Sequence, residues 1–220
     1  MTARAVDRPV EARRGSMALS IKRLTAPAHR QAEAVVQRAA PLSSHRAYVA
    51  YLTRLHAFYA AVEPRLFELL GDFLPDASER RKLDLIERDL AALGGLVPSG
   101  PAMHAPSLPR LTCTASAMGV AYVLEGKTLG SRFLLEDARR LLDLDAGRGA
   151  SFFAGYEART GAMWRVYRDE LESFVAQNGR RATVLAGATS TFASFIRWVA
   201  PLGDGRETRH GTDATVRCEP

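Results

Sequence analysis

A histidine and a glutamate four residues apart form the first group of side chains that could do chemistry. His29 and Glu33 lie in a segment with helical periodicity, and the i, i+4 spacing puts both on one helix face. An imidazole there can ligate iron, and the carboxylate can orient its ring. Lys22 precedes His29 by seven residues, about two turns. Taken alone, the pair is more typical of an ordinary histidine beside a helical carboxylate, because such i, i+4 pairs are common.

The second group lies about a hundred residues later, in the segment Gly126-Lys-Thr-Leu-Gly130-Ser131. Glycine inside a helix costs about 1 kcal/mol relative to alanine, so two glycines in a helix-forming run call for a reason. Close approach of the backbone to a ligand is one such reason, and a turn between two helices is the other. A turn accounts for Gly126 well and for Gly130 less well. With His29, the segment suggests the two sides of a haem pocket.

The elements that must position these groups are helices. Apolar residues recur at three- and four-residue steps over residues 45–70, which predicts a long amphipathic helix, with Ser43 or Ser44 as N-cap, Gly71 at its end and a kink or split at Pro64. Helical periodicity also covers residues 21–38, with the regular part starting near Thr25, and residues 76–93, 112–144 with a break at 126–131, 149–176 and 180–199. No segment alternates as a strand should. We predict an all-α, single-domain, multi-helix bundle of about seven helices.

Composition is consistent with one globular domain. The chain has 220 residues, of which 47% are hydrophobic and 25% charged, which is typical of a soluble protein. Residues 1–16 are Arg-rich and residues 204–220 polar, so we expect two disordered tails around a helical domain at 17–203. Val97 to Pro109 reads as a Pro-rich loop. No apolar run approaches the roughly 20 residues of a transmembrane helix.

Charge and cysteine content narrow the function classes. A net charge of +6 permits nucleic-acid binding, but much of the excess lies in the tails and no recognition motif accompanies it, so we expect neither nucleic-acid nor membrane binding. Cys113 and Cys218 form neither a disulfide framework nor a metal-ligand spacing. A reducing, cytoplasmic location fits best.

Two stretches together resemble a known family. Leu24-Thr-Ala-Pro-Ala-His-Arg-Gln-Ala-Glu33 and Tyr122-Val-Leu-Glu-Gly-Lys-Thr-Leu-Gly-Ser131 are similar to the proximal and distal helices of haem (heme) oxygenases, in particular the bacterial forms found beside biliverdin-binding phytochromes. The resemblance spans residues 20–200. It implies that His29 is the axial ligand of the haem iron, that Glu33 accompanies it, and that Lys22 meets a haem propionate.

The resemblance also assigns the opposite face of the pocket. It implies that Gly126, Gly130 and Ser131 belong to a catalytic distal segment, which flexes over the oxygen-binding face. Arg168, in the matching Trp164-Arg-Val-Tyr-Arg168 run, and Arg165 are the implied propionate partners, because anionic groups favour arginine.

The chain departs from the family pattern at two positions. Ser131 replaces a second glycine, which adds a hydroxyl and some bulk. Lys127 stands where many members have an aspartate that organises distal water, although the phytochrome-linked forms often lack that aspartate. These departures put haem seating, regiochemistry and proton delivery in question.

The activity implied by the resemblance is oxygen- and reductant-dependent cleavage of haem to biliverdin, CO and free iron. Haem b would be both substrate and cofactor, molecular oxygen the oxidant, and a ferredoxin- or flavin-type reductase the external electron donor. A bacteriophytochrome would be a possible acceptor of biliverdin. We expect a monomer or weak dimer.

Three other functions fit the residues less well. A non-enzymatic haem-binding protein of the same fold is suggested by Ser131 and Lys127. A thiaminase-like hydrolase would use Cys113 as nucleophile with Glu125, although no base is visible beside the cysteine. A plain helical interaction module would bind no haem.

Overall fold

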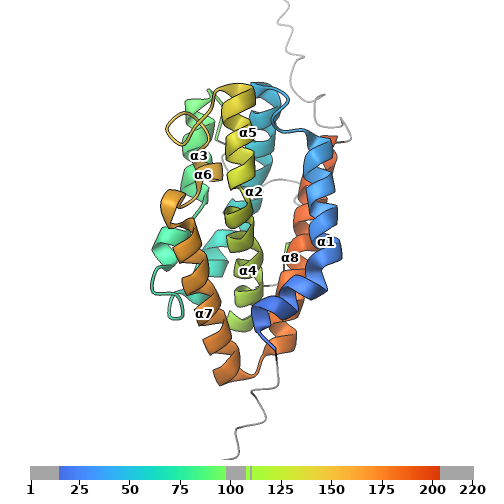
Figure 1. Cartoon of the computed structure of the whole chain (residues 1–220), viewed down its shortest axis with the longest axis vertical. Helices are drawn as coiled ribbons and strands as arrows, with labels where there is room; N and C mark the ends of the chain where they lie inside the picture. Colours follow the sequence, from blue (N-terminus) through green and yellow to red (C-terminus); the bar gives the residue numbers. More distant parts are fainter. Residues whose placement is uncertain (1–14, 98–107, 110, 204–220) are drawn as a thin grey trace, which may run out of the picture.

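Helices account for nearly all of the computed structural model, which describes residues 15–97, 108–109 and 111–203 (Figure 1). Within these described ranges, seven α-helices have ten or more residues, and α6 is a single turn. The elements are α1 Met17–Ala39, α2 His45–Leu70, η2 Ala77–Arg80, α3 Leu83–Ala92, α4 Thr114–Gly130, α5 Arg132–Leu142, α6 Ser151–Ala154, η3 Glu157–Arg159, α7 Thr160–Asn178 and α8 Arg181–Gly203. The all-α prediction is confirmed, since the described residues contain no strand. The predicted tails, apart from residues 15 and 16, and most of the predicted loop at 97–109 lie outside the described residues.

The α2 helix has the predicted ends. It begins at His45, where the Ser44 hydroxyl accepts a hydrogen bond from the Ala47 N–H at 3.1 Å, and it ends at Leu70. The predicted split at Pro64 is wrong, because the helix continues through the proline, and the alternative of a kink there stays a prediction. Buried Val62 and Leu66 hold the helix on both sides of the proline, so packing outweighs the lost backbone hydrogen bond.

The α1 helix begins earlier than predicted, at Met17 instead of Ile21, and Pro27 lies inside it. Ser16 is the N-cap, and its hydroxyl accepts a hydrogen bond from the Leu19 N–H at 3.4 Å. The Glu172 carboxylate of α7 accepts hydrogen bonds from the N–H groups of Met17, at 2.8 Å, and Ala18, at 3.1 Å. A first-turn N–H has no partner within its own helix, so the local cap and the distant carboxylate together satisfy the start of α1. Figure 1 shows that α1 changes direction along its length.

Two predicted helices are each divided. The segment 76–93 forms η2 and α3 because Glu63 of α2 accepts the N–H of Lys82 at 2.6 Å and caps the start of α3. The segment 149–176 is divided at Gly155, whose φ is +57°, and a Cβ there would lie 2.5 Å from Thr128 Cγ2. Only glycine fits both restrictions.

The predicted break at 126–131 is narrower than expected. The α4 helix runs through Gly126 to Gly130 without interruption, and the boundary with α5 falls at Ser131. The prediction of a simple turn at Gly126 is therefore wrong. The reason for a glycine at this position has to be sought in the surroundings of α4.

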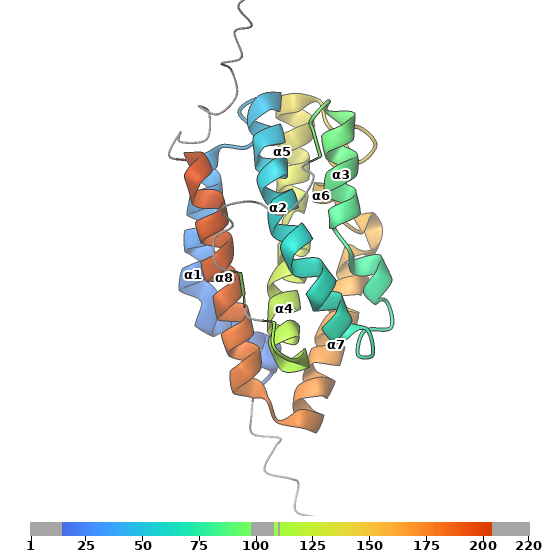
Figure 2. The same ribbon diagram turned by 180° about the vertical axis from the view of Figure 1, so that it is seen from behind.

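The α4 and α8 helices meet at two glycines. A Cβ on Gly119 would lie 2.1 Å from the Val184 carbonyl oxygen, and a Cβ on Gly187 would lie 2.4 Å from the Ser116 carbonyl oxygen. The backbones therefore touch at this crossing. Figures 1 and 2 show the two helices side by side at this end of the bundle and farther apart toward the end of α4, with α1 lying along α8.

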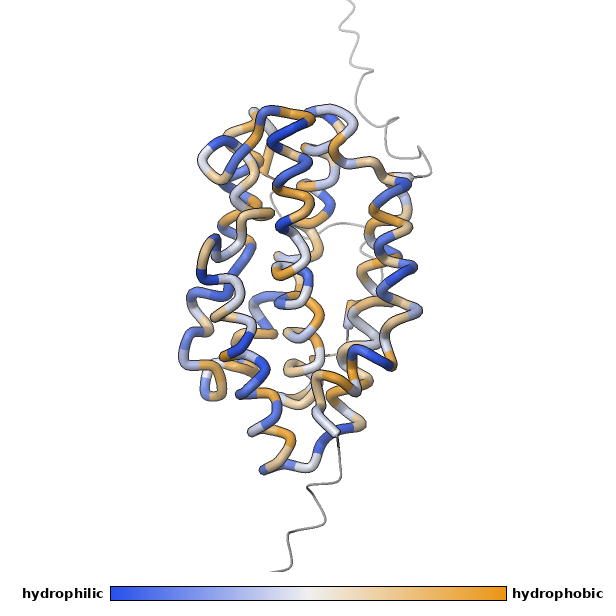
Figure 3. Tube along the Cα trace, in the orientation of Figure 1, coloured by the Kyte–Doolittle hydropathy of each residue, from blue (hydrophilic) through white to orange (hydrophobic). Residues whose placement is uncertain are grey.

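Hydrophobic and hydrophilic residues alternate along the long helices at roughly the period of a helical turn (Figure 3). The α4 helix is the exception, because most of its residues from Ala115 to Glu125 are buried. It therefore lies inside the bundle, packed against α2, α7 and α8.

The helix crossing gives a stability prediction with a matched control. We expect Gly119→Ala to lower the free energy of unfolding of the apoprotein by about 1–3 kcal/mol or more, because the added methyl forces α4 and α8 apart. Gly130→Ala, where a Cβ meets nothing within 4 Å, is expected to change it by no more than about 1 kcal/mol. Urea unfolding followed by circular dichroism measures both. Equal stabilities for the two variants would contradict the assigned crossing.

Candidate functional site

His29 lies on α1 with its two ring nitrogens in different surroundings. Its Nδ1 is 3.4 Å from Glu33 Oε1, and the two side chains are 58% and 59% exposed. The ring meets Phe192 of α8 edge to face, with 5.7 Å between centroids. A tautomer that carries its proton on Nδ1 leaves the Nε2 lone pair available, and Nε2 has no hydrogen bond with the described part of the chain. A carboxylate near Nδ1 is the kind of neighbour that can orient a ligating histidine.

The faces of α1 and α4 are brought into register by a hydrogen bond. The Tyr122 hydroxyl of α4 donates to the Ala18 carbonyl of α1 at 3.0 Å. Both helices run in the same direction in Figure 1. At 1.5 Å per residue, Gly130 lies about 12 Å beyond Tyr122, and His29 about 16 Å beyond Ala18. The glycines and the histidine are therefore at similar heights on their two helices.

The glycine face of α4 is open. A Cβ on Gly130 would meet nothing within 4 Å, and one on Gly126 would come no closer than 3.9 Å to Trp164. The packing of the protein itself thus requires glycine at neither position, unlike Gly119. A flat group lying against the α4 backbone would use the space that side chains here would fill.

Ser131 does not project onto this face. It is 2% exposed, and its hydroxyl donates a hydrogen bond to the Lys127 carbonyl oxygen at 2.9 Å. The extra hydroxyl is therefore accommodated within the helix boundary, and its bulk is buried.

The candidate propionate partners are exposed. Lys22 shares a face of α1 with His29, and Arg165 and Arg168 lie on α7. Burial raises the pKa of the Tyr122 hydroxyl, and the positive charge of Arg168 opposes this shift, which places Arg168 near α4. Among the described interactions, none connects the Arg165 side chain to α1 or α4.

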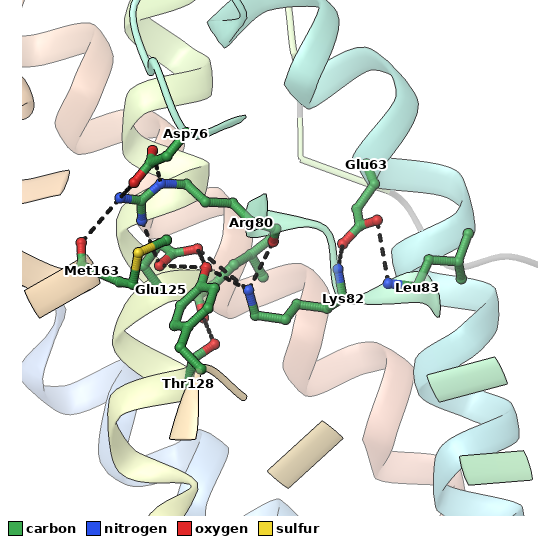
Figure 4. A network of polar contacts seen from close by, with 10 residues as sticks. Glu63, Asp76, Arg80, Lys82, Leu83, Glu125, Thr128 and Met163 are labelled. Atoms are coloured by element: carbon green, nitrogen blue, oxygen red, sulfur yellow. Dashed lines mark hydrogen bonds and ion pairs between the residues drawn. The ribbon is translucent and has the colours of Figure 1, made fainter. Parts of the chain in front are cut away.

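A buried ionic network stands immediately before the glycine face (Figure 4). The Arg80 guanidinium donates to both carboxylate oxygens of Asp76, at 2.6 and 2.7 Å, and to Glu125 Oε2 at 2.8 Å. The Tyr156 hydroxyl donates to Glu125 Oε1 at 2.8 Å and accepts a hydrogen bond from Lys82 Nζ at 2.6 Å. Glu125 directly precedes Gly126, so the network holds α4 beside its open face.

Sequence reasoning missed this network. In the run Arg80-Arg81-Lys82 the charges look like a solvated surface, yet Arg80 and Lys82 are buried. Burial lowers the pKa of Lys82, and the charge of Glu125 opposes the shift. The available signal was Glu125, a carboxylate in an otherwise apolar and small-residue run, because a buried charge requires a partner.

The geometry does not support the predicted pairing of Cys113 with Glu125. Cys113 is the N-cap of α4, and Glu125 lies three turns later on the same helix, about 18 Å away along its axis. Hydrogen bonding to the Ser116 N–H lowers the pKa of the Cys113 thiol. Nucleophile and carboxylate therefore do not share a site.

The chain matches the family model "Heme oxygenase" over residues 15–201. The match covers most of this all-α bundle and shows that the chain belongs to the heme oxygenase family. It is a haem-degrading oxidoreductase with haem as its substrate. The hydrolase and non-enzymatic alternatives are not favoured.

Two relatives support the assignment in sequence. Heme oxygenase PigA of Pseudomonas aeruginosa is 27% identical over 188 residues, which are 85% of this chain and 93% of PigA. A heme oxygenase of Xanthomonas campestris is 29% identical over 150 residues, which are 67% of this chain and 86% of that protein.

Solved structures show the same fold. The NO- and CO-bound heme oxygenase of Neisseria meningitidis superposes with a TM-score of 0.75 at 24% identity, covering 87% of this chain and 94% of that one. The heme oxygenase of Leptospira interrogans gives a TM-score of 0.68 at 20% identity, with coverages of 84% and 99%. Among the described residues, no helix is long and apolar enough to span a bilayer.

The buried network gives a second stability prediction. We expect Glu125→Ala to lower the free energy of unfolding by about 3–5 kcal/mol, because Lys82 and one Arg80 N–H group lose their buried counter-charge. Glu136→Ala is the control, since Glu136 is exposed and lies 3.7 Å from exposed Arg139; its effect should be below about 1 kcal/mol. Denaturant titration of both variants tests this, and a Glu125→Ala protein as stable as the control would be evidence against a structural role for the network.

Proposed function

We propose that haem binds between α1 and α4 and is cleaved there to biliverdin, CO and free iron. The observation that carries the proposal is the pairing of His29, whose Nε2 is available, with the open glycine face of α4 at the same height. When bound, haem supplies the iron at which oxygen is activated and the ring that is oxidised. The chain supplies the groups that hold it.

The two sides of the pocket have different tasks. On α1, His29 would hold the haem iron through Nε2, and Glu33, whose Oε1 lies 3.4 Å from Nδ1, would orient the ring. On α4, Gly126 and Gly130 let the backbone approach the opposite face of the haem. Ser131 ends this catalytic segment, with its hydroxyl turned away into the helix.

The edge of the pocket carries the positive charge that the two propionates require. Lys22 extends from the His29 face of α1, and Arg168 stands near Tyr122 where α7 approaches α4. Arg165 is a second arginine on the same helix. Exposed side chains of this kind suit carboxylates that lie at the protein surface.

The remaining partners follow from the chemistry and the sequence resemblance. Ring oxidation consumes electrons as well as molecular oxygen, so a ferredoxin- or flavin-type reductase serves as donor. The distal segment is similar to that of phytochrome-linked forms, which supports a bacteriophytochrome as biliverdin acceptor. We propose a monomeric or weakly dimeric cytoplasmic enzyme.

The proposed ligand is tested with His29→Ala, and His45→Ala is the matched control because His45 is an exposed histidine at the start of α2. One equivalent of haemin is added, followed by ascorbate under air with an iron chelator. We expect wild type and the control to give a sharp Soret band that decays into the red absorption of biliverdin, and His29→Ala to give no turnover with an intact helical circular dichroism spectrum.

Other outcomes separate the alternatives. Biliverdin formation by His29→Ala would refute the ligand assignment. A stable Soret band in the wild-type protein would indicate a haem carrier, and no band would contradict haem binding.

The propionate partners are tested by haem affinity. We expect Arg168→Gln to weaken haemin binding about two- to fivefold, in line with an exposed ion pair, and Arg165→Gln to weaken it less, because only Arg168 lies near Tyr122. Arg139→Gln, an exposed arginine on α5, controls for the loss of one positive charge. A titration followed at the Soret maximum measures the three constants, and equal values for Arg168→Gln and Arg139→Gln would remove Arg168 from the site.

A further inference from the structure

Lys127 of α4 is the most unusual ionisable group beside the proposed pocket. Its stem is partly exposed, but Nζ is fully buried and has no hydrogen-bond partner among the described residues. Nζ lies over the rings of Phe152 of α6, Phe195 of α8 and Tyr51 of α2, at 4.5, 5.8 and 6.0 Å from the centroids. An amine without an acceptor in aromatic surroundings is costly to bury, so it calls for an explanation.

Lys127 and His29 contact the same helix one turn apart. The His29 ring meets Phe192, and Lys127 Nζ lies over Phe195. These aromatic residues are neighbours on the buried face of α8, separated by about 4.5 Å of helix rise. The aromatic face of α8 therefore contacts both the proposed iron ligand and the Lys127 amine.

Helix geometry places Lys127 at the border of the glycine face. Lys127 follows Gly126 by one residue and precedes Gly130 by three. Around the helix axis, its side chain therefore points about 100° away from the direction of Gly126 and about 60° away from that of Gly130. It therefore emerges on the α8 and α2 side of the open face. A group lying against Gly126 and Gly130 would have Lys127 at its inner edge.

No counter-charge is paired with this amine in the described structure. The facing groups are Tyr51 and Tyr48 on α2, whose hydroxyls also lack partners, the rings of Phe152 and Phe153 on α6, and Phe195 on α8. The Asp89 carboxylate of α3 already accepts hydrogen bonds from the N–H groups of Ser151 and Phe152. Burial alone lowers the pKa of Lys127 to about 7.

We infer, on the basis of the proposed haem site, that Lys127 is an anion-binding group that stabilises small anionic ligands on the α4 side of the haem. An ammonium group in a dry aromatic pocket interacts with an anion more strongly than one in water does. Oxygen that accepts electrons on this side acquires negative charge. A fixed positive charge at position 127 stabilises this negative charge. A carboxylate at the same position would not.

Ligand affinity tests the inference without turnover. The ferric haem complexes of wild type, Lys127→Met and Arg139→Gln are titrated with sodium azide at pH 6, where Lys127 carries its proton. The ferrous complexes are titrated with carbon monoxide, a neutral ligand, under argon. Methionine keeps the length of the lysine stem, and Arg139→Gln controls for net charge.

We expect Lys127→Met to weaken azide binding at least tenfold, to leave carbon monoxide affinity within threefold, and to retain the haem affinity of the wild type. Unchanged azide affinity, or equal changes for azide and carbon monoxide, would overturn the inference and leave the haem site intact. A wild-type protein without a Soret band would instead contradict the proposed function.

A second measurement does not involve haem. The chain has only three lysines, Lys22, Lys82 and Lys127, so NMR of the apoprotein labelled with 13C at lysine Cε resolves each one. We expect a resonance that titrates near pH 7 and is missing from Lys127→Met. If the missing resonance titrates near 10, the amine is solvated and the inference is wrong.

Discussion

The contact between Gly119 of α4 and Gly187 of α8 is the constraint on which the arrangement of the site depends. Two backbones can touch at one crossing only where neither carries a Cβ, and helices that cross at an angle then separate along their length. Because α1 packs along α8, it separates from the end of α4 together with α8 (Figure 2). The open face at Gly130 is thus a consequence of close contact at Gly119, about three turns earlier.

Two long-range polar contacts keep the separated helices in register. The Glu172 carboxylate holds the first N–H groups of α1, and the Tyr122 hydroxyl ties α4 to the same turn at Ala18. About one turn later on α4, Glu125 anchors the helix through Arg80 and Tyr156. Buried charge pairs of this kind add little net stability compared with apolar packing, but breaking one is costly, so they favour a single position of the helix.

The site combines a rigid frame with groups left unsatisfied by the protein. Glu125 and Arg80 satisfy one another, whereas Lys127, two residues later on the same helix, finds no acceptor among the described residues. On α1, Glu33 Oε1 lies 3.4 Å from Nδ1 of His29. Glycines at 126 and 130 add space that packing does not require. The proposed haem site rests on the combination of these features.

The sequence by itself determined the features that depend on neighbouring residues. Periodicity and the Ser44 cap set both ends of α2, and the i, i+4 spacing put Glu33 beside His29. The fold class and the glycine segment could also be predicted, although the roles of the site residues remain predictions. Only the tertiary structure decided that the first N–H groups of α1 are held by a carboxylate of α7, that Gly126 lies within a helix, and that Arg80 and Lys82 are buried. Each of these depends on a partner far along the chain, such as Glu172 for Met17 or Glu125 for Arg80, and local periodicity carries no information about such partners.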